Sequence, residues 1–195
     1  MRKLLLICAI VGAVFVNPAI YAQEQGLTVL SDHWMPYNGD PKAKLPGYII
    51  ECLQEIYGKK QVEYKIQPWT RSIFNVRSGA GDSVVGAAPG DCPDFIFPKE
   101  SFGLVGTFVY VLKDSKLEYK RPESLKDVLV GLIDGYSYDV EFDKYIKDNR
   151  DQLKLHFSKG DDALEKMIKM LQAKRLDAFL ESPAVFEWTL KSKKL

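Results

Sequence analysis

Apolar and polar positions change their period repeatedly along this chain, and the changes divide it into short strands and amphipathic helices. Runs rich in β-branched and aromatic residues alternate with segments in which apolar residues recur every three or four positions. In the first half, this pattern predicts strands at residues 27–31, 62–67 and 83–87 and helices at residues 47–57 and 70–77. A βαβαβ order of this kind predicts a parallel sheet with right-handed crossovers.

The second half repeats the alternation after a longer apolar strand at residues 104–112. The predicted elements are strands at 128–133, 153–157 and 177–181 and helices at 138–149, 161–174 and 183–194. Helix 161–174 has the clearest apolar stripe, and Asp161 or Asp162 can cap its start. Two α/β units joined by one long strand predict two lobes with a cleft between them, a layout that usually closes around a ligand by a hinge.

The N-terminus has the pattern of a cleaved secretory signal peptide covering residues 1–22. Basic residues at positions 2 and 3 precede an apolar run, and the small residue Ala22 marks a cleavage point. The alternative is an uncleaved anchor, although Asn17 and Pro18 interrupt the run earlier than a membrane span allows. We therefore expect a periplasmic protein.

Charge and cysteine content limit the partners of the mature chain. The sequence has 27 Lys and Arg against 26 Asp and Glu, so it offers no basic stripe for nucleic acid. No stretch after the leader is apolar enough for stable membrane insertion. Cys52 and Cys92 remain after cleavage and could form one disulfide in an oxidising compartment. The alternative is a core thiol on a helix and a separate loop thiol, because sequence alone does not reveal pairing.

Catalytic equipment is sparse in the sequence. His33 and His156 are the only histidines, and they stand far apart without a motif around them. The sequence contains no nucleophile elbow, no phosphate-binding glycine loop and no Cys/His spacing for zinc. We therefore expect no catalytic residues, no metal site and no cofactor.

Candidate binding groups lie where the predicted strands end, which is where open α/β sheets bind ligands. Trp34 and Tyr37 follow the first strand and can stack on a ligand, or form a small core beneath the loop. Trp69 and Arg71 follow the second strand, and Arg71 can hold a carboxylate or instead make an ion pair.

The later strands contribute to the same predicted edge. The small residues Gly86 and Ala87 end the third strand and let a ligand approach the backbone. The amides of residues 135–137 could receive an anion, although Ser137 could equally be a helix cap. The complete predicted site is Trp34, Tyr37, Trp69, Arg71, Gly86, Ala87, Gly135, Tyr136, Ser137, Glu181 and Ser182.

The order and spacing of these motifs resemble the extracellular solute-binding proteins of family 3, which are periplasmic receptors for amino acids and similar polar solutes. The matching motifs are Trp34-Met35-Pro36-Tyr37, Gly47, Pro68-Trp69-x-Arg71, Gly81-Asp82, Phe95-x-Phe97-Pro98, Ser124-Leu125-Lys126-Asp127, Gly135-Tyr136-Ser137-Tyr138 and Leu176-Asp177-Ala178. The resemblance implies an α/β fold of the type II periplasmic-binding-protein kind, with two lobes, a hinge and an interlobe cleft. It implies lobe 1 at residues 23–108, lobe 2 at 109–188 and a tail at 189–195. It also implies a receptor that presents a small polar or amino-acid-like ligand to the membrane permease of an ABC transporter.

The chain departs from the family pattern at the ligand clamp. The family's carboxylate-binding arginine is replaced by Asp94, and its ammonium-binding aspartate by Ser182 next to Glu181. Arg71 and Glu181 could act as a relocated pair. The family's usual return to lobe 1 is also not found before Leu195, so we expect a truncated product, a shortened variant or a protein completed by a partner.

Two other functions remain open from the sequence. One is a sensory or regulatory ligand-binding module on the same fold. The other is an enzyme, because a few relatives of this fold are periplasmic dehydratases. An enzyme would need an acid or base in the cleft, and Glu181 and His33 are the candidates.

Overall fold

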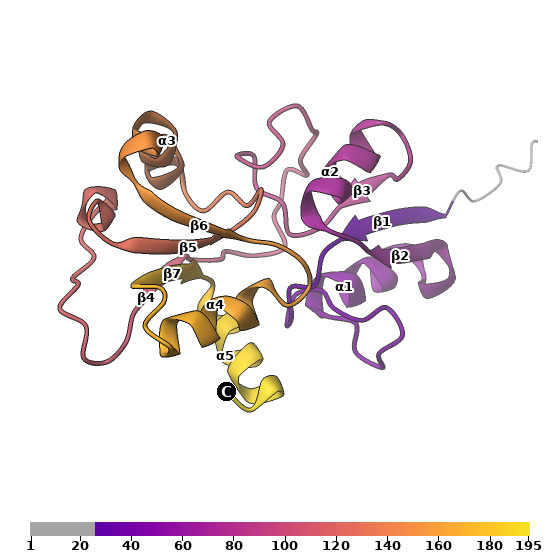
Figure 1. Cartoon of the computed structure of the whole chain (residues 1–195). Coiled ribbons are helices and arrows are strands. Elements are labelled where there is room, and N and C mark those ends of the chain that lie inside the picture. The colour runs from indigo at the N-terminus through magenta and orange to yellow at the C-terminus, as the bar shows by residue number, and fades with distance from the viewer. Residues whose placement is uncertain (1–25) are drawn as a thin grey trace, which may run out of the picture.

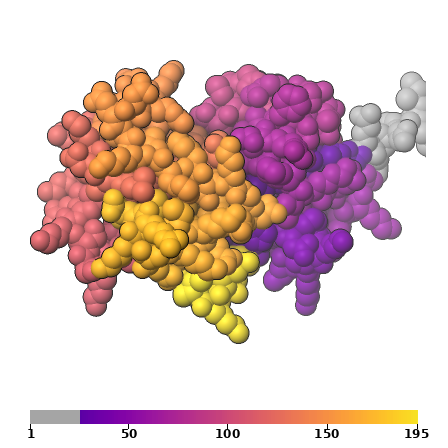
Figure 2. Space-filling model, viewed as in Figure 1, coloured from indigo at the N-terminus to yellow at the C-terminus, as the bar shows by residue number. Residues whose placement is uncertain are grey.

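Two α/β lobes, each built around its own sheet, make up the part of the chain that the structure describes (Figure 1). The computed structural model describes residues 26–195, so the predicted signal peptide and its cleavage after Ala22 lie outside the described residues. The space-filling view shows the indigo-to-magenta lobe 1 and the orange-to-yellow part of lobe 2 in contact (Figure 2).

Lobe 1 is the predicted parallel βαβαβ unit. Its elements are β1 (Leu27–Ser31), α1 (Tyr48–Tyr57), η1 (Lys59–Gln61), β2 (Val62–Ile66), α2 (Trp69–Arg77) and β3 (Ser83–Val84). The strand order is β2-β1-β3, with β1 parallel to both neighbours. Because the chain visits first one edge of the sheet and then the other, α1 and α2 lie on opposite faces (Figure 1).

This placement of the helices separates the two cysteines. Cys52 lies on α1, whose buried side chains pack with Val29. Cys92 is buried with Trp69 and Ile73 of α2. The sheet therefore stands between the two thiols, both are free, and the disulfide that the sequence left open does not form.

Lobe 2 has a mixed sheet of order β4-β7-β5-β6, in which only β4 runs antiparallel to its neighbour. Its elements are β4 (Phe108–Tyr110), η2 (Pro122–Leu125), β5 (Leu129–Ile133), α3 (Val140–Asn149), η3 (Arg150–Gln152), β6 (Lys154–Ser158), α4 (Ala163–Gln172), β7 (Ala178–Glu181) and α5 (Pro183–Lys193). Phe179 packs with α4 and α5 on one face, whereas Leu180 packs with Phe142 of α3 on the other. Alternate residues of β7 thus fill two separate cores.

Two strands are shorter than the sequence predicts, because a strand persists only where a partner continues its ladder. The predicted strand 104–112 is paired only at Phe108–Tyr110, opposite β7, and Leu104 before it is 99% exposed. In the predicted strand 83–87, only Ser83 and Val84 pair with β1. Gly86, which follows two residues later, has a φ of +82°.

The helix boundaries also shift by a few residues. Helix α3 begins at Val140 and not at 138, because the Asp139 carboxylate caps it by accepting the Phe142 N–H at 2.8 Å. Helix α4 covers Ala163–Gln172, inside the predicted 161–174. Most of the predicted tail 189–195 is the last part of α5, which packs on α4. No helix in residues 26–195 is long and apolar enough to cross a membrane.

Candidate ligand-binding site

The turn after β1 is fixed by a buried amide. Asn38 is fully buried and donates from Nδ2 to the Asp32 carbonyl at 2.7 Å. Gly47 lies against this turn with a φ of +119°, and a Cβ there would come within 2.6 Å of the Tyr37 carbonyl oxygen. The turn therefore holds the predicted aromatic pair in one arrangement, with the Trp34 and Tyr37 ring centroids 4.6 Å apart.

Trp34 of lobe 1 reaches a carboxylate at the end of β7 in lobe 2. Its indole Nε1 donates to Glu181 Oε1 at 3.1 Å, and the Ser182 N–H donates to the same oxygen at 2.7 Å. Glu181 is 3% exposed, and its second oxygen, Oε2, has no hydrogen-bond partner in the described structure. Burial raises the pKa of Glu181 from 4.5 to about 7. The cleft thus holds a carboxyl group with one oxygen still able to accept.

A second pair crosses between the lobes at the end of β1. The Tyr136 hydroxyl of lobe 2 donates to Asp32 Oδ2 of lobe 1 at 2.5 Å. Burial raises the pKa of Asp32 from 3.8 to about 6, and it raises the pKa of Tyr136 well above 10. Asp32 therefore belongs to the cleft, although the sequence analysis had not counted it among the site residues.

The segment 135–137 of lobe 2 is occupied by groups of lobe 1. Trp69 Nε1 donates to the Gly135 carbonyl at 3.1 Å, and the Ser137 N–H donates to Asp91 Oδ1 at 2.8 Å. The Ser137 hydroxyl donates to Asp143 within lobe 2. The anion that the predicted amide receptor holds is consequently the chain's own Asp91 carboxylate.

Two glycines bring the lobes this close. Gly135 has a φ of +80°, and a Cβ on it would lie 2.4 Å from Cγ2 of Thr70 in α2. A Cβ on Gly90 of lobe 1 would lie 2.3 Å from the Ser137 hydroxyl oxygen. Glycine is required at Gly135 for both its backbone angle and its contact.

Between these interlobe contacts lies a cavity of about 160 Å³. Lobe 1 lines it with residues 32–35 of the turn after β1, and lobe 2 lines it from its strand ends and from α4 and α5. The lobe 2 residues most relevant to its chemistry are Tyr136, Asp161, Glu165, Glu181, Trp188 and Lys193. The His33 and Trp188 ring centroids lie 5.6 Å apart, and so α5 faces the turn after β1.

The cavity lining is acidic. It contains four carboxyl groups (Asp32, Asp161, Glu165 and Glu181) against one lysine, Lys193. Glu165 pairs with Lys169 at 2.6 Å and with Lys193 at 3.4 Å, so two lysines share this carboxylate. Burial lowers the pKa of His33, which keeps its imidazole neutral at pH 7.

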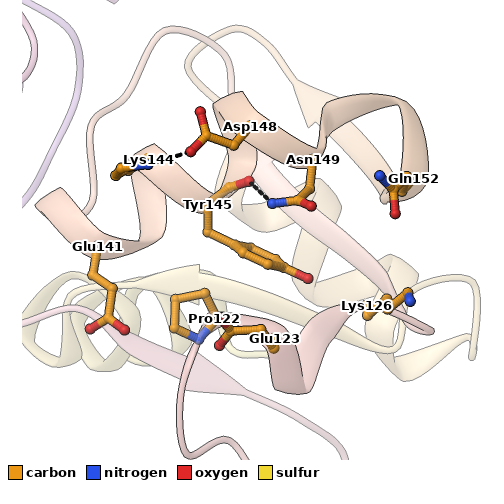
Figure 3. A pocket seen from close by; sticks show the side chains of 9 residues that line it. All are labelled: Pro122, Glu123, Lys126, Glu141, Lys144, Tyr145, Asp148, Asn149 and Gln152. Atoms are coloured by element: carbon orange, nitrogen blue, oxygen red, sulfur yellow. Dashed lines mark hydrogen bonds and ion pairs between the residues drawn. The ribbon is translucent and has the colours of Figure 1, made fainter.

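A larger hollow of about 490 Å³ lies away from the cleft, on lobe 2 between η2 and α3 (Figure 3). Lys144 pairs with Asp148 at its edge, and Asn149 Nδ2 donates to the Tyr145 carbonyl at 3.0 Å. Only lobe 2 lines it, its charged groups are exposed, and it contains none of the predicted site residues. The interlobe cavity is therefore the stronger candidate.

The structure gathers some of the predicted residues at the cavity and leaves others outside. Trp34, Tyr136 and Glu181 line it. Gly86 lies beside the Trp34 ring, Ala87 belongs to the cluster around Trp69, and Ser182 is buried with an unpartnered hydroxyl. Arg71 is exposed on α2 and does not line the cavity, and Tyr37 packs on the Trp34 ring. These ligand roles stay predictions.

Sequence reasoning missed the contribution of α5. Val185, Thr189 and Lys193 line the cavity at a spacing of four residues, and Trp188 joins them. That spacing marks one face of a helix and was visible in the sequence. It gives no indication of whether the face meets a core or a ligand.

Asp94, the residue at the predicted position of the family's carboxylate-binding arginine, is not part of the cavity lining. Asp94 stands where the resemblance expects an arginine, and it is half exposed. Arg77 of α2 holds it in a two-pronged ion pair, with distances of 2.6 Å and 2.7 Å. The departure from the amino-acid receptor pattern stays a prediction, and the structure shows that the Asp94 carboxylate is paired with Arg77.

Comparison with solved structures gives the same two-lobed architecture. An ancestral arginine-binding protein bound to arginine is 24% identical, with 87% of this chain and 75% of that one covered and a TM-score of 0.67. A structure for glutathione import in Gram-positive bacteria, via GshT and the cystine ABC importer TcyBC of Streptococcus mutans, is 17% identical, with coverages of 87% and 72% and a TM-score of 0.68. A solute receptor for L-cysteine of Neisseria gonorrhoeae is 17% identical, with coverages of 88% and 70% and a TM-score of 0.61.

The fold is that of the type II periplasmic binding proteins. No family model and no curated protein matches the chain. The type II fold was predicted from the sequence resemblance, and the comparison confirms it. At these identities the likeness establishes the fold, and the ligand must be argued from the cavity.

Proposed function

We propose that this chain is a periplasmic solute-binding receptor that captures a small polar ligand between its lobes and presents it to an ABC-type transporter. The observation that supports this most is the cavity between the strand ends of the two lobes, lined from both sides. In a two-lobed fold, a ligand bound there favours the closed state because it contacts both lobes only when they are closed.

The structural neighbours support the same kind of partner. They include ancestral arginine-binding proteins bound to arginine and to glutamine, a solute receptor for L-cysteine, and a structure for glutathione import via GshT and a cystine ABC importer. The leader pattern at residues 1–22 supports export to the periplasm. We place the boundary between lobe 1 and lobe 2 near residue 108, where β4 joins the second sheet, and we assign α5 to lobe 2.

A binding screen of the mature chain tests this proposal. Thermal unfolding is followed with amino acids, short peptides, organic acids and amines, and each hit is repeated by titration calorimetry. A ligand at about 100 times its dissociation constant adds about 2.7 kcal/mol to the free energy of unfolding. Saturable binding is the expected result, and a chain that binds none of these solutes contradicts the proposal.

One observation also favours an enzymatic function. Glu181 is a buried acid in the cleft with a pKa of about 7, which suits a general acid or base at neutral pH. Incubating each bound solute with the protein and following it by NMR separates the two functions. Conversion that is lost in a Glu181→Gln variant would establish the enzyme, whereas unchanged solute supports the receptor.

A further inference from the structure

We infer that the interlobe cavity selects a small organic cation without a carboxylate, such as an alkyl diamine or an aminoalkylguanidine, in preference to an α-amino acid. This inference rests on the proposed function, since it names the ligand class of the same site. Four features of the cavity support it.

The first feature is an excess of carboxyl groups over cationic groups. Asp32, Asp161 and Glu181 line the cavity, and none of them has an ion-pair partner within 4 Å in the described residues. The lining's single lysine, Lys193, pairs with Glu165, which it shares with Lys169 from outside the lining, so three carboxyl groups face one lysine. A ligand carboxylate would add repulsion to this lining, whereas an ammonium or guanidinium group would supply the missing charge.

The second feature is the unpartnered oxygen of Glu181. Trp34 and the Ser182 amide both donate to Oε1, which leaves Oε2 without a donor in a side chain that is 3% exposed. Buried acceptors are expected to be hydrogen-bonded, and an exception at a cavity wall indicates an absent donor. A cationic N–H group makes the strongest such bond to a carboxylate.

The third feature is that each group offered by the sequence for a ligand carboxylate is engaged elsewhere or lies outside the cavity. The Ser137 amide holds Asp91, and Asp94 replaces the expected arginine and pairs with Arg77. Arg71 is exposed on α2 and is not part of the cavity lining. A carboxylate entering this cavity would therefore lose its hydration, and the only lysine that it could meet there is Lys193, which already contacts Glu165.

The fourth feature is the shape and chemistry of the remaining wall. Ile133, Leu164 and Val185 contribute apolar surface, and Trp34 and Trp188 contribute indole rings. These groups suit a chain of methylene groups, and the rings can attract a cation through their π-faces. A volume of about 160 Å³ restricts the ligand to a small molecule.

Matched ligand pairs test this inference directly. Cadaverine and lysine share their ammonium groups and carbon chain and differ by a carboxylate, and so do agmatine and arginine. Titration calorimetry of the mature chain is expected to give cadaverine or agmatine at least a tenfold lower dissociation constant than its amino-acid counterpart. Equal or tighter binding of lysine and arginine would overturn the inference.

A pair of variants adds a control on the site. Glu181→Gln keeps an oxygen that can accept from Trp34 but removes the charge, and it is expected to weaken cadaverine or agmatine binding at least tenfold. Glu187→Gln removes the same charge from the exposed face of α5, where Glu187 pairs with Lys191, and it is expected to leave binding unchanged. Circular dichroism confirms that both variants fold. Unchanged amine affinity in folded Glu181→Gln overturns the inference.

The remaining outcomes separate this inference from the proposed function. If none of the four ligands binds but the broader screen finds another saturable solute, the cation preference is overturned and the receptor function stands. If no solute of any class binds, both are overturned.

Discussion

The indole nitrogen of Trp34 and the carboxylate of Glu181 lie 3.1 Å apart, although 147 positions separate them in sequence and each belongs to a different lobe. The contact joins the turn after the first strand to the end of the last strand. It therefore couples the closure of the lobes to the charge state of a buried acid.

Trp34→Phe is expected to weaken the closed state. The variant keeps an aromatic ring but removes the only interlobe donor to Glu181 among the described residues. The Ser182 N–H still donates to the same oxygen, so the loss is that of one hydrogen bond, about 0.5–1.5 kcal/mol. Thermal unfolding and small-angle X-ray scattering should report a lower Tm and a larger radius of gyration.

Trp188→Phe is the matched control for this change. Trp188 lines the same cavity, but no hydrogen bond of its indole nitrogen occurs in residues 26–195. We expect a smaller loss of stability than for Trp34→Phe. Equal losses in both variants would show that ring size, and not the hydrogen bond, matters at Trp34.

Stability without ligand is expected to fall as the pH rises from 5 to 8. The pKa of Glu181 is raised from 4.5 to about 7 and that of Asp32 from 3.8 to about 6, because burial disfavours their charged forms. At these two groups the folded state therefore holds more protons than the unfolded state, and the stabilisation present at low pH is lost as they ionise. His33, whose pKa is lowered by burial, acts in the opposite direction below about pH 6.5 and partly offsets the trend there. The carboxylates with lowered pKa values, such as Asp94, are ionised in both states above pH 5 and do not oppose this trend.

Thermal unfolding at pH 5, 6, 7 and 8 measures this dependence. Glu181→Gln should flatten the curve above pH 5, because it removes the group with the larger shift. A Tm that rises steadily towards pH 8 would contradict the buried state of these two acids.

Affinity for an amine ligand is expected to rise as the pH rises, whereas the stability of the ligand-free protein falls. The ionised form of Glu181 binds the cation, so below a pKa of about 7 each binding event must release a proton. Affinity should then fall by up to about tenfold per pH unit below pH 7. Asp32, whose pKa is raised to about 6, shares this effect. The other ionisable side chains that line the cavity are His33, Tyr136, Asp161, Glu165 and Lys193.

Calorimetry in two buffers of different ionisation enthalpy counts the released protons. We expect a net release at pH 6 that is smaller in Glu181→Gln, where Asp32 remains to release protons. Proton uptake at pH 6 would show that another group controls binding.

Gly135→Ala is expected to hold the lobes apart. The new Cβ would lie 2.4 Å from Cγ2 of Thr70 and would also occupy a φ of +80°. Gly79→Ala is the matched control, because Gly79 has a φ of +79° and no atom within 4 Å of its added Cβ. Both variants carry the backbone strain, of about 1 kcal/mol, and only Gly135→Ala adds the collision. Scattering should give a larger radius of gyration for Gly135→Ala alone, and equal radii would contradict a direct lobe contact.

Periodicity was sufficient to predict most of the fold, because amphipathic helices and β-branched strands have local signals. The strand ends at Val84 and Phe108 were not predictable, since they depend on where a neighbouring strand stops. The aromatic turn and Glu181 were predicted from their position at strand ends. The engagement of Ser137 by Asp91 was not, because it depends on how the two lobes meet, and no local pattern encodes that.

The Asp91 carboxylate beside the Ser137 amide has a kinetic consequence. Because lobe 1 supplies its own anion to lobe 2, the two lobes are joined at this point by protein groups alone. A ligand can shift the equilibrium between shut and open forms only by the difference between its affinities for the two forms. If the chain is the receptor proposed above, the rate of solute capture at high solute concentration would be limited by the rate at which the hydrogen bond between the Ser137 amide and Asp91 breaks.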